Sequence, residues 1–261
     1  MTSFVIGESA PRGIATISLN RPDKANSYDA AMLQEIAAHF ERFGADQEVR
    51  AIVLRGAGRH FSAGADVAGA EPQPGGRGIH EVCSLIEASP KPTIALVRGA
   101  CVGGGMALAC ACDILIAARG AFFSVPEVRL GFTPGPLSLF FARALGLRAF
   151  RRYALTGQRF SAEECSRIGL VHELCEDETL DQGLAAQIEE ILLAAPNAAR
   201  GAKAIAARLE AWSGNAALVA ELQAQFLELR HSAEAEEGQA SFRGKRKPAW
   251  YPDKKTTGET R

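Results

Sequence analysis

The sequence predicts an α/β fold, built as a spiral of repeated β-β-α turns and completed by a helical C-terminal region. Short apolar runs typical of buried strands alternate with helical patterns through the first two thirds of the 261 residues. The tripeptide Arg-Gly-Ala follows three of these runs, at residues 55–57, 98–100 and 119–121. From Leu137 onward the pattern is mostly helical. This order fits one layered core better than a Rossmann sheet.

Composition narrows the class of ligand before any motif is considered. The formal net charge is -1, the isoelectric point is near 6.5, and 47% of the residues are hydrophobic. These values give no global field that would attract nucleic acid or an anionic membrane, so an anionic ligand has to be met locally. We therefore expect neither nucleic acid nor a membrane as a partner.

The N-terminal segment and the longest apolar segment lack targeting and membrane signals. Residues 1–13 have no charged stretch followed by an apolar one, which predicts a cytoplasmic protein. Gly99–Ala118 is as long as a bilayer span, but three consecutive glycines and Asp113 would be costly there. We expect a turn, a buried helix and a buried strand instead. The six cysteines are expected as small buried hydrophobes, and Cys110 with Cys112 lacks the second ligand pair of a zinc site.

The first elements have clear boundaries. Ile14–Leu19 is predicted as a strand that ends before Pro22, because proline cannot continue a ladder. Ser27 or Asp29 then caps a helix running to Gly44. Its apolar face recurs at spacings of three and four residues and consists of Met32, Leu33, Ile36, Ala37, Phe40 and Phe43.

The Arg-Gly-Ala repeat gives the spiral its period. Ala51–Leu54 is a short continuous apolar run, consistent with a buried parallel strand, and the tripeptide follows it. The tripeptide recurs after Thr93–Val97 and after Ile114–Ala118. Each time a strand runs into a glycine turn, as a repeated strand-strand-helix unit requires. In a chain rich in alanine and glycine, chance also explains the coincidence, and the repeat alone does not separate the two.

The C-terminal part is dominated by helical patterns. Ser161 caps a short helix, Val171–Leu174 is a brief strand, and amphipathic runs follow at residues 180–195, 198–212 and 216–229. Such helices pack on another subunit or back on their own core. We therefore divide the chain into a core at residues 1–195 and a helical region with a basic tail at residues 196–261.

Most catalytic and nucleotide-binding motifs are missing. The sequence has no Gly-x-Ser-x-Gly, His-Glu-x-x-His or Gly-x-x-x-x-Gly-Lys, and Gly56-Ala57-Gly58 lacks the third glycine of a dinucleotide fingerprint. Two glycine-bearing turns remain, at Phe61–Asp66 and Val102–Ala107. Bare turns at a helix start offer free N–H groups, and two such amides can hold an oxyanion. Tight packing alone would also explain these turns.

Taken together, these segments resemble the crotonase family, the enoyl-CoA hydratases and isomerases, from about residue 14 to residue 248. The matching pieces are, in order, Ile17–Pro22, Phe61–Val67, Gly99–Asp113 with its triplet Gly103–Gly105, Pro126-Glu127, Leu155–Gly157 and Gly169–Val171. Their order and spacing make the resemblance specific. It implies a crotonase-like spiral, a C-terminal trimerisation region and a homo-oligomer, either a trimer or a dimer of trimers.

The resemblance also assigns roles to residues. The family's oxyanion hole uses the N–H groups of the alanine before the aspartate and of the middle glycine of the triplet, here Ala65 and Gly104. Family hydratases use two glutamates, and the matching positions here are Ala107 and Glu127. Ala107 cannot handle a proton and is expected only to line the substrate site. Glu127 has apolar sequence neighbours, which should raise the pKa of its carboxyl group toward the range useful for acid-base catalysis.

One carboxylate suffices to move a proton from the α carbon to the γ carbon, so the leading hypothesis is an isomerase that converts 3-enoyl-CoA to 2-enoyl-CoA. The alternatives are a 2-enoyl-CoA hydratase or a related acyl-CoA lyase, and a non-catalytic binding member. Polar groups that could assist Glu127 are Asp66, His80, Glu81 and Thr133. We expect no metal and no separate cofactor, because coenzyme A is part of the acyl-CoA substrate.

The resemblance places the adenine of coenzyme A between two backbone segments. The first comprises Lys24, Ala25 and Asn26, and the second comprises Ser62 and Ala63. The family's usual run after the Pro-Glu turn is replaced here by Thr133–Ser138, so the acyl pocket wall should be reshaped.

The basic tail is a weaker candidate for phosphate binding. Arg243–Lys255 has six basic residues against one acid. The resemblance suggests that Lys245 and Lys247 reach the phosphates of a neighbouring subunit's ligand and that Phe242 packs nearby. Lysines in such a position are also typical of a solvated terminus.

Overall fold

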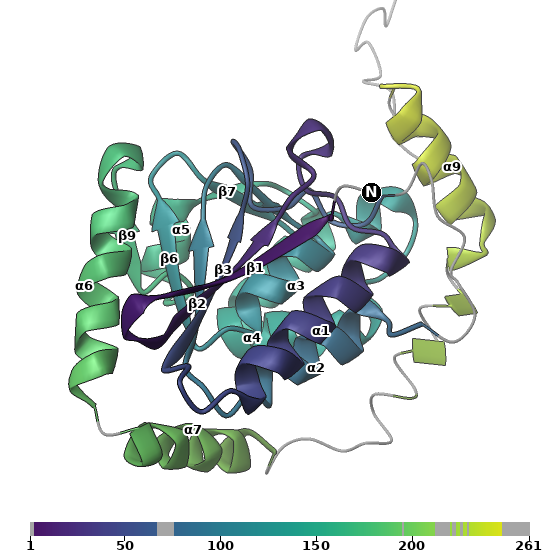
Figure 1. The fold of residues 1–261 in the computed structure, drawn as a ribbon. Helices are drawn as coiled ribbons and strands as arrows, with labels where there is room; N and C mark the ends of the chain where they lie inside the picture. Colours follow the sequence, from purple (N-terminus) through teal and green to yellow (C-terminus); the bar gives the residue numbers. More distant parts are fainter. Residues whose placement is uncertain are drawn as a thin grey trace, which may run out of the picture.

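The computed structural model describes residues 3–66, 76–194, 196–211 and 230–246, with residues 220, 223–224 and 227–228 between the last two ranges. Two sheets with helices packed around them form this part of the chain (Figure 1). The larger sheet has the strand order β1-β2-β3-β4-β6-β9 and the smaller has the order β5-β7-β8. The strands are β1 Val5–Ala10, β2 Ile14–Leu19, β3 Ala51–Gly56, β4 Thr93–Val97, β5 Ala100–Val102, β6 Ile114–Ala118, β7 Phe122–Ser124, β8 Phe160–Ser161 and β9 Glu173–Cys175.

Several helices fall close to the ranges that the sequence predicts. The helices are α1 Ala30–Ala45, α2 Ile79–Glu87, α3 Gly104–Cys110, α4 Ser138–Thr156, α5 Ala162–Arg167, α6 Leu180–Leu193, α7 Pro196–Ala211 and α9 Ala233–Arg243. Of these, α2 and α9 were not predicted. Short 3-10 helices lie at η1 Pro11–Gly13, η2 Pro22–Lys24, η3 Glu127–Leu130, η4 Gly135–Leu137 and η5 Asp177–Thr179. Of the two predicted caps for α1, Asp29 is the one used, because its side chain accepts a hydrogen bond from the Met32 N–H at 2.9 Å.

The central strands β3, β4 and β6 of the larger sheet are buried on both faces. Strands β2, β3, β4, β6 and β9 run parallel, and β1 is antiparallel to β2. In β3, Ile52 and Leu54 join the cluster that includes α1, whereas Ala51 and Val53 join the cluster that α6 covers. Figure 1 shows α1 and α6 on opposite sides of this sheet. Burial on both faces explains why the strands read as continuous apolar runs.

The Arg-Gly-Ala repeat marks successive corners of a spiral. After β4 the chain turns at residues 98–100 and enters β5 of the smaller sheet, and after β6 it turns at residues 119–121 and enters β7. The earlier turn at residues 55–57 leads to a parallel bridge between Ser62 and Cys101, which continues the smaller sheet. Gly99 has φ +56°, which a glycine adopts without strain. The predicted repeat of strand-strand-helix turns is therefore structural.

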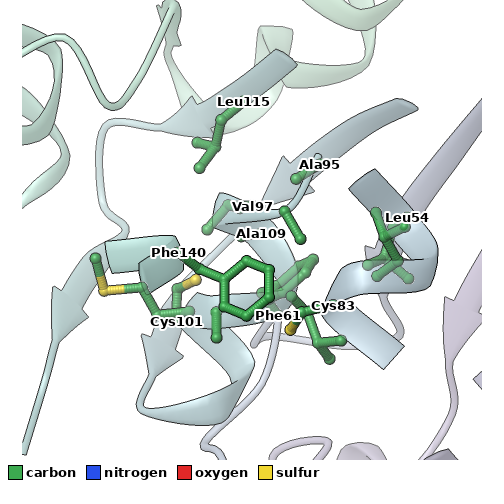
Figure 2. Close-up of a cluster of buried hydrophobic side chains, with 14 of the residues drawn as sticks. Leu54, Phe61, Cys83, Ala95, Val97, Cys101, Ala109, Leu115 and Phe140 are labelled. Carbon is green, nitrogen blue, oxygen red and sulfur yellow. The ribbon is translucent and has the colours of Figure 1, made fainter. Parts of the chain in front are cut away.

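The larger hydrophobic cluster contains several of the cysteines. Figure 2 shows Cys83 and Cys101 among Phe61, Phe140 and other buried apolar side chains. Burial raises the pKa of both thiols well above its ordinary value. All six cysteines are free, and four are buried while Cys110 and Cys112 are half-buried. The prediction of small buried hydrophobes is confirmed for the four.

The C-terminal region returns to the core. Helix α9, capped by the Ser232 side chain, packs against η3 so closely that a Cβ atom at Gly238 would lie 2.5 Å from the Leu130 carbonyl oxygen. The brief strand predicted at residues 171–174 is β9, two residues further on, since Leu170 and Val171 form a turn held by Cys165 O. Most of the run predicted at residues 216–229 lies outside the described residues.

Two further expectations concern membrane-spanning helices and the division of the chain. No helix within the described ranges is long and apolar enough to cross a membrane. The division at residue 195 remains a prediction, as does a role of the C-terminal helices in trimerisation.

Candidate active site

The turn at residues 61–66 is fixed by neighbouring backbone on both sides. Ser62 N–H donates to Ala100 O at 3.0 Å, and Ala63 N–H donates to Ala25 O at 2.9 Å. Further along, Asp66 N–H donates to Tyr28 O at 2.8 Å. Between them, the N–H of Ala65 donates to no group in the described part of the chain. The turn therefore presents one free amide from a rigid frame.

The second free amide comes from the start of α3. Gly104 N–H is the first of the helix and also donates to no described group. A Cβ atom at Gly64 would lie 3.8 Å from the Gly104 nitrogen, so the Ala65 turn lies directly against this helix start. The two amides predicted as oxyanion donors are thus brought together, although 39 residues separate Ala65 and Gly104 in the sequence.

Each glycine of the triplet is required by a different close neighbour. Gly103 has φ +52°, and a Cβ atom there would lie 3.1 Å from Glu127 Oε1. At Gly104 a Cβ atom would overlap the Tyr28 hydroxyl oxygen, and at Gly105 it would lie 2.6 Å from Ser62 Oγ. The bare backbone lets two side chains and the oxyanion turn meet at one helix end.

Glu127 opens η3 with its carboxyl group buried. The residue is 7% exposed, and Oε2 has no hydrogen-bond partner in the part of the chain that the structure describes. Burial raises the pKa of Glu127 to about 7, opposed in part by a hydrogen bond from its own backbone. Near neutral pH this carboxyl group can both accept and return a proton, as the sequence-based interpretation expects.

A partly buried ion-pair network holds Asp66, the residue after Ala65. Arg21 Nη2 lies 3.0 Å from Asp66 Oδ2, and Lys24 Nζ lies 3.0 Å from the same oxygen. Arg21 Nη1 also donates to Ser27 O at 2.9 Å. Lys24 first and Arg21 next hold the pKa of Asp66 below its usual value, although burial opposes them. Asp66 is therefore occupied as a structural anchor and is a poor candidate for assisting Glu127.

The two backbone segments predicted to flank adenine lie side by side, but the Ser62 side chain is used within the protein. Ala25 lies beside Ala63, and Lys24 is half exposed nearby. Ser62 is fully buried, and its Oγ donates to Asn26 O at 2.9 Å and accepts from Gly64 N–H at 3.2 Å. The Ser62 side chain therefore holds the turn, so only its backbone is available to a ligand.

The remaining candidates, Glu81, Ala107 and Thr133, differ in their surroundings. Glu81 Oε2 accepts a hydrogen bond from Gly78 N–H at 2.6 Å and caps α2, next to His80. Ala107 is fully buried in α3. Thr133 Oγ1 is the other buried side-chain atom without a partner among the described residues, and it follows the turn that begins at Glu127.

The candidates in the tail are exposed or lie outside the described residues. Phe242 is 63% exposed at the end of α9, and Lys245 is exposed just beyond it. Lys247 lies outside the described residues. Their contact with the phosphates of a ligand remains a prediction.

Tyr28 is the neighbour of the site that sequence reasoning missed. It pairs with Ala65 in a parallel bridge, and its hydroxyl group lies against Gly104. No local pattern marks this residue, because it stands in the loop between η2 and α1. Within the described ranges, no group of three or more His, Cys, Asp or Glu side chains is placed to hold a metal ion.

Comparison with known proteins places this geometry in a family. The family model described as enoyl-CoA hydratase/isomerase matches residues 9–253. The chain belongs to the enoyl-CoA hydratase/isomerase family. An enoyl-CoA hydratase of Alternaria alternata is 29% identical over 90% of this chain and 80% of that protein. The mitochondrial Delta(3,5)-Delta(2,4)-dienoyl-CoA isomerase of Pongo abelii is 34% identical over 69% of this chain and 62% of that protein.

Solved structures of this family share the fold. An enoyl-CoA hydratase from Mycobacterium avium subsp. paratuberculosis superposes with a TM-score of 0.83 at 26% identity, covering 94% of this chain and 97% of that one. AtuE of Pseudomonas aeruginosa superposes with a TM-score of 0.74 at 38% identity, covering 96% of this chain and 100% of that one. The predicted crotonase-like α/β fold is confirmed.

Proposed function

We propose that this family member is an enoyl-CoA isomerase that moves a double bond from the 3 to the 2 position of an acyl-CoA thioester. The observation that carries the proposal is the pairing of one buried carboxyl group with two free amides at a single helix end. Glu127 supplies the carboxyl group, and Ala65 and Gly104 supply the amides.

The proposed reaction needs one base and no water. The Glu127 carboxylate takes a proton from the α carbon, and the electron pair moves through the thioester to give a dienolate. Negative charge collects on the thioester oxygen, where the two amides stabilise it, a term worth roughly 2.7–4 kcal/mol per donor in other oxyanion holes. The same carboxyl group then returns the proton to the γ carbon, leaving the double bond at position 2.

Ala107 favours isomerisation over hydration. Hydratases of this family are expected to orient and deprotonate water with two glutamates, and one of those positions is occupied here by a buried methyl group. One carboxyl group is enough to transfer a proton between two carbons. The Glu127 pKa of about 7 suits both directions of that transfer.

A 2-enoyl-CoA hydratase is the second candidate, and Thr133 is the observation that favours it. Its buried Oγ1 has no partner among the described residues and could orient a water molecule. Several relatives, including the Alternaria alternata protein, are named hydratases. A related acyl-CoA lyase would use the same enolate.

The rest of the substrate site is proposed on the same basis. Adenine would lie between the backbone of Lys24 and Ala25 and that of Ala63, which the structure holds side by side. The substrate brings its own coenzyme A, and no further cofactor takes part in the proposed steps. A homo-oligomer, a trimer or a dimer of trimers, is part of this proposal.

The proposal is tested by product analysis in deuterated water. Purified protein is incubated with 3-enoyl-CoA and 2-enoyl-CoA substrates of several chain lengths, and the products are analysed by mass spectrometry. A positional shift with deuterium incorporation and no added water supports the isomerase. Addition of water identifies the hydratase instead. Absence of any change in all substrates, together with no deuterium uptake, contradicts both.

A further inference from the structure

Tyr28 connects the two amides of the proposed oxyanion hole. Its N–H donates to Gly64 O at 2.9 Å and its carbonyl oxygen accepts from Asp66 N–H at 2.8 Å, so its backbone runs beside Ala65. Its side chain crosses to the other turn, where a Cβ atom at Gly104 would overlap the hydroxyl oxygen and lie 2.7 Å from Cζ. One residue therefore touches both halves of the site.

The Tyr28 hydroxyl group has no partner among the described residues but is not fully enclosed, because the buried side-chain atoms without a partner there are Glu127 Oε2 and Thr133 Oγ1. The residue is 8% exposed, and its hydroxyl group makes no hydrogen bond to any residue in the described ranges. Tyrosines that pack in a protein core usually have a partner for the hydroxyl group. Tyr153 shows the usual arrangement, since its hydroxyl group donates to Glu164 Oε1 at 2.8 Å. A phenylalanine at position 28 would pack the same ring but would offer no donor beside Gly104.

The surroundings keep the Tyr28 hydroxyl group protonated. Burial raises the pKa of the phenol far above its ordinary value, and the nearby Cys83 and Glu127 raise it further while Arg230 lowers it. A phenol that holds its proton at neutral pH is a hydrogen-bond donor. An enolate oxygen beside the two amides would be stabilised by such a donor.

We propose that the Tyr28 hydroxyl group is a third hydrogen-bond donor to the thioester oxygen, beside the amides of Ala65 and Gly104. This inference rests on the proposed function. No covalent change is added, because Glu127 moves the proton and the phenol keeps its own throughout. The negative charge that forms on the oxygen is shared among three donors.

The test uses acetoacetyl-CoA, whose enolate absorbs in the near ultraviolet, as a probe of oxyanion stabilisation that needs no turnover. The enolate fraction of the bound probe is measured at fixed pH for the wild type, Tyr28→Phe and Tyr153→Phe. The kcat and KM for 3-enoyl-CoA are measured alongside. We expect Tyr28→Phe to lower the enolate fraction and to lower kcat about 10- to 100-fold, because two amides remain. We expect KM to change by less than about threefold and the melting temperature to change little, because the hydroxyl group has no partner among the described residues to lose.

Tyr153→Phe is the matched control, because it also removes one hydroxyl group from a tyrosine that packs in the core. This hydroxyl group has a carboxylate partner remote from the site in sequence and role. The control should lower the melting temperature and leave the enolate fraction unchanged. Replacing Tyr28 site-specifically with 3-fluorotyrosine, a stronger donor, should raise the enolate fraction, and this second variant keeps the test valid if Tyr28→Phe folds poorly.

Failure of the proposed Tyr28 role and failure of the proposed function give different results in this test. If the wild type binds and enolises the probe while Tyr28→Phe and the fluorinated variant match it, the role of Tyr28 is wrong and the proposed function stands. If the wild type neither binds nor enolises acetoacetyl-CoA, the proposed function is wrong and the role of Tyr28 falls with it.

Discussion

The two sides of the candidate site differ in how their polar side chains are bonded. On the side of the Ala65 turn, Arg21, Ser62 and Asp66 all have hydrogen-bond or ion-pair partners. On the other side, Glu127 Oε2 is buried without a partner among the described residues, as is Thr133 Oγ1 six positions further along the chain. Fully bonded polar groups fix a backbone, whereas buried groups with unmet bonding capacity are candidates for contact with substrate.

Polarity and burial alone do not identify a catalytic group. Ser62 and Glu127 are both polar, buried and close to the glycine triplet. The Ser62 hydroxyl group has two partners and sustains the shape of the turn, and Glu127 lies in an environment that disfavours its charge. We therefore expect substitutions on one side to affect mainly stability, and those on the other to affect mainly turnover.

The largest expected effect is on the side of Glu127. Glu127→Gln keeps the shape of the side chain but removes the base, so kcat for isomerisation should fall by roughly 10²–10⁴-fold or more. Acyl-CoA affinity should change only a few-fold, because the carboxyl group is needed mainly in the proton-transfer step. Steady-state kinetics and calorimetric binding measure the two quantities.

Glu81→Gln is the control for this substitution. Glu81 caps α2 through a hydrogen bond that glutamine can also accept, so turnover should not change. Full activity of Glu127→Gln would contradict the proposed mechanism.

The next largest effect is expected at the shared helix end. Gly104→Ala places a methyl group where the Tyr28 hydroxyl group lies, so the start of α3 has to move and take the Gly104 amide out of position. Loss of one oxyanion donor predicts a fall in kcat of about 10²–10³-fold. Gly201→Ala in α7 is the control, since nothing lies near its Cβ position and helix propensity favours alanine. Wild-type turnover of Gly104→Ala would remove this amide from the mechanism.

A smaller effect is expected on stability as the pH changes. The folded pKa of Glu127, about 7, lies above the ordinary value of 4.5, so the folded protein holds this proton more tightly than the unfolded chain. The resulting stabilisation is complete below pH 4.5 and is lost as pH rises toward 7. Glu127→Gln should therefore match the wild type at low pH and exceed its free energy of unfolding above pH 7 by on the order of 3 kcal/mol.

Urea denaturation across this pH range measures the difference between the two proteins. A difference that is constant with pH would show that the Glu127 pKa is not raised. Turnover of the wild type should rise over the same range, because the charged form that burial disfavours is the base.

The smallest effect is expected for Ser62→Ala on the bonded side. Removing Oγ leaves Asn26 O and Gly64 N–H without this partner, which should cost roughly 1–3 kcal/mol of unfolding free energy. Turnover well below the melting temperature should stay within about threefold of the wild type. Ser9→Ala on the exposed edge of β1 is the control and should change stability by less than about 0.5 kcal/mol. A large loss of turnover with unchanged stability would place the Ser62 side chain in contact with substrate.

Several elements of the fold and site are readable from local pattern. Helix α1 follows from its cap and its apolar spacing, and β3 follows from an apolar run of buried residues. Strand β1 was not predicted. Its residues are mostly exposed and give no alternating pattern, and the strand is ordered by its pairing with β2. Strand β9 was placed two residues early, since its bounds depend on pairing with β6.

The sequence by itself determined the spiral of β-β-α turns, the glycine turns and Glu127 as the acid-base candidate, because these depend on short-range spacing and on family resemblance. Only the tertiary structure decided which polar groups are bonded and which are not. The Arg21–Asp66 pair joins residues 45 positions apart, and the contact of Tyr28 with Gly104 joins two different turns of the spiral. Such contacts arise when non-local elements pack, so no local pattern records them.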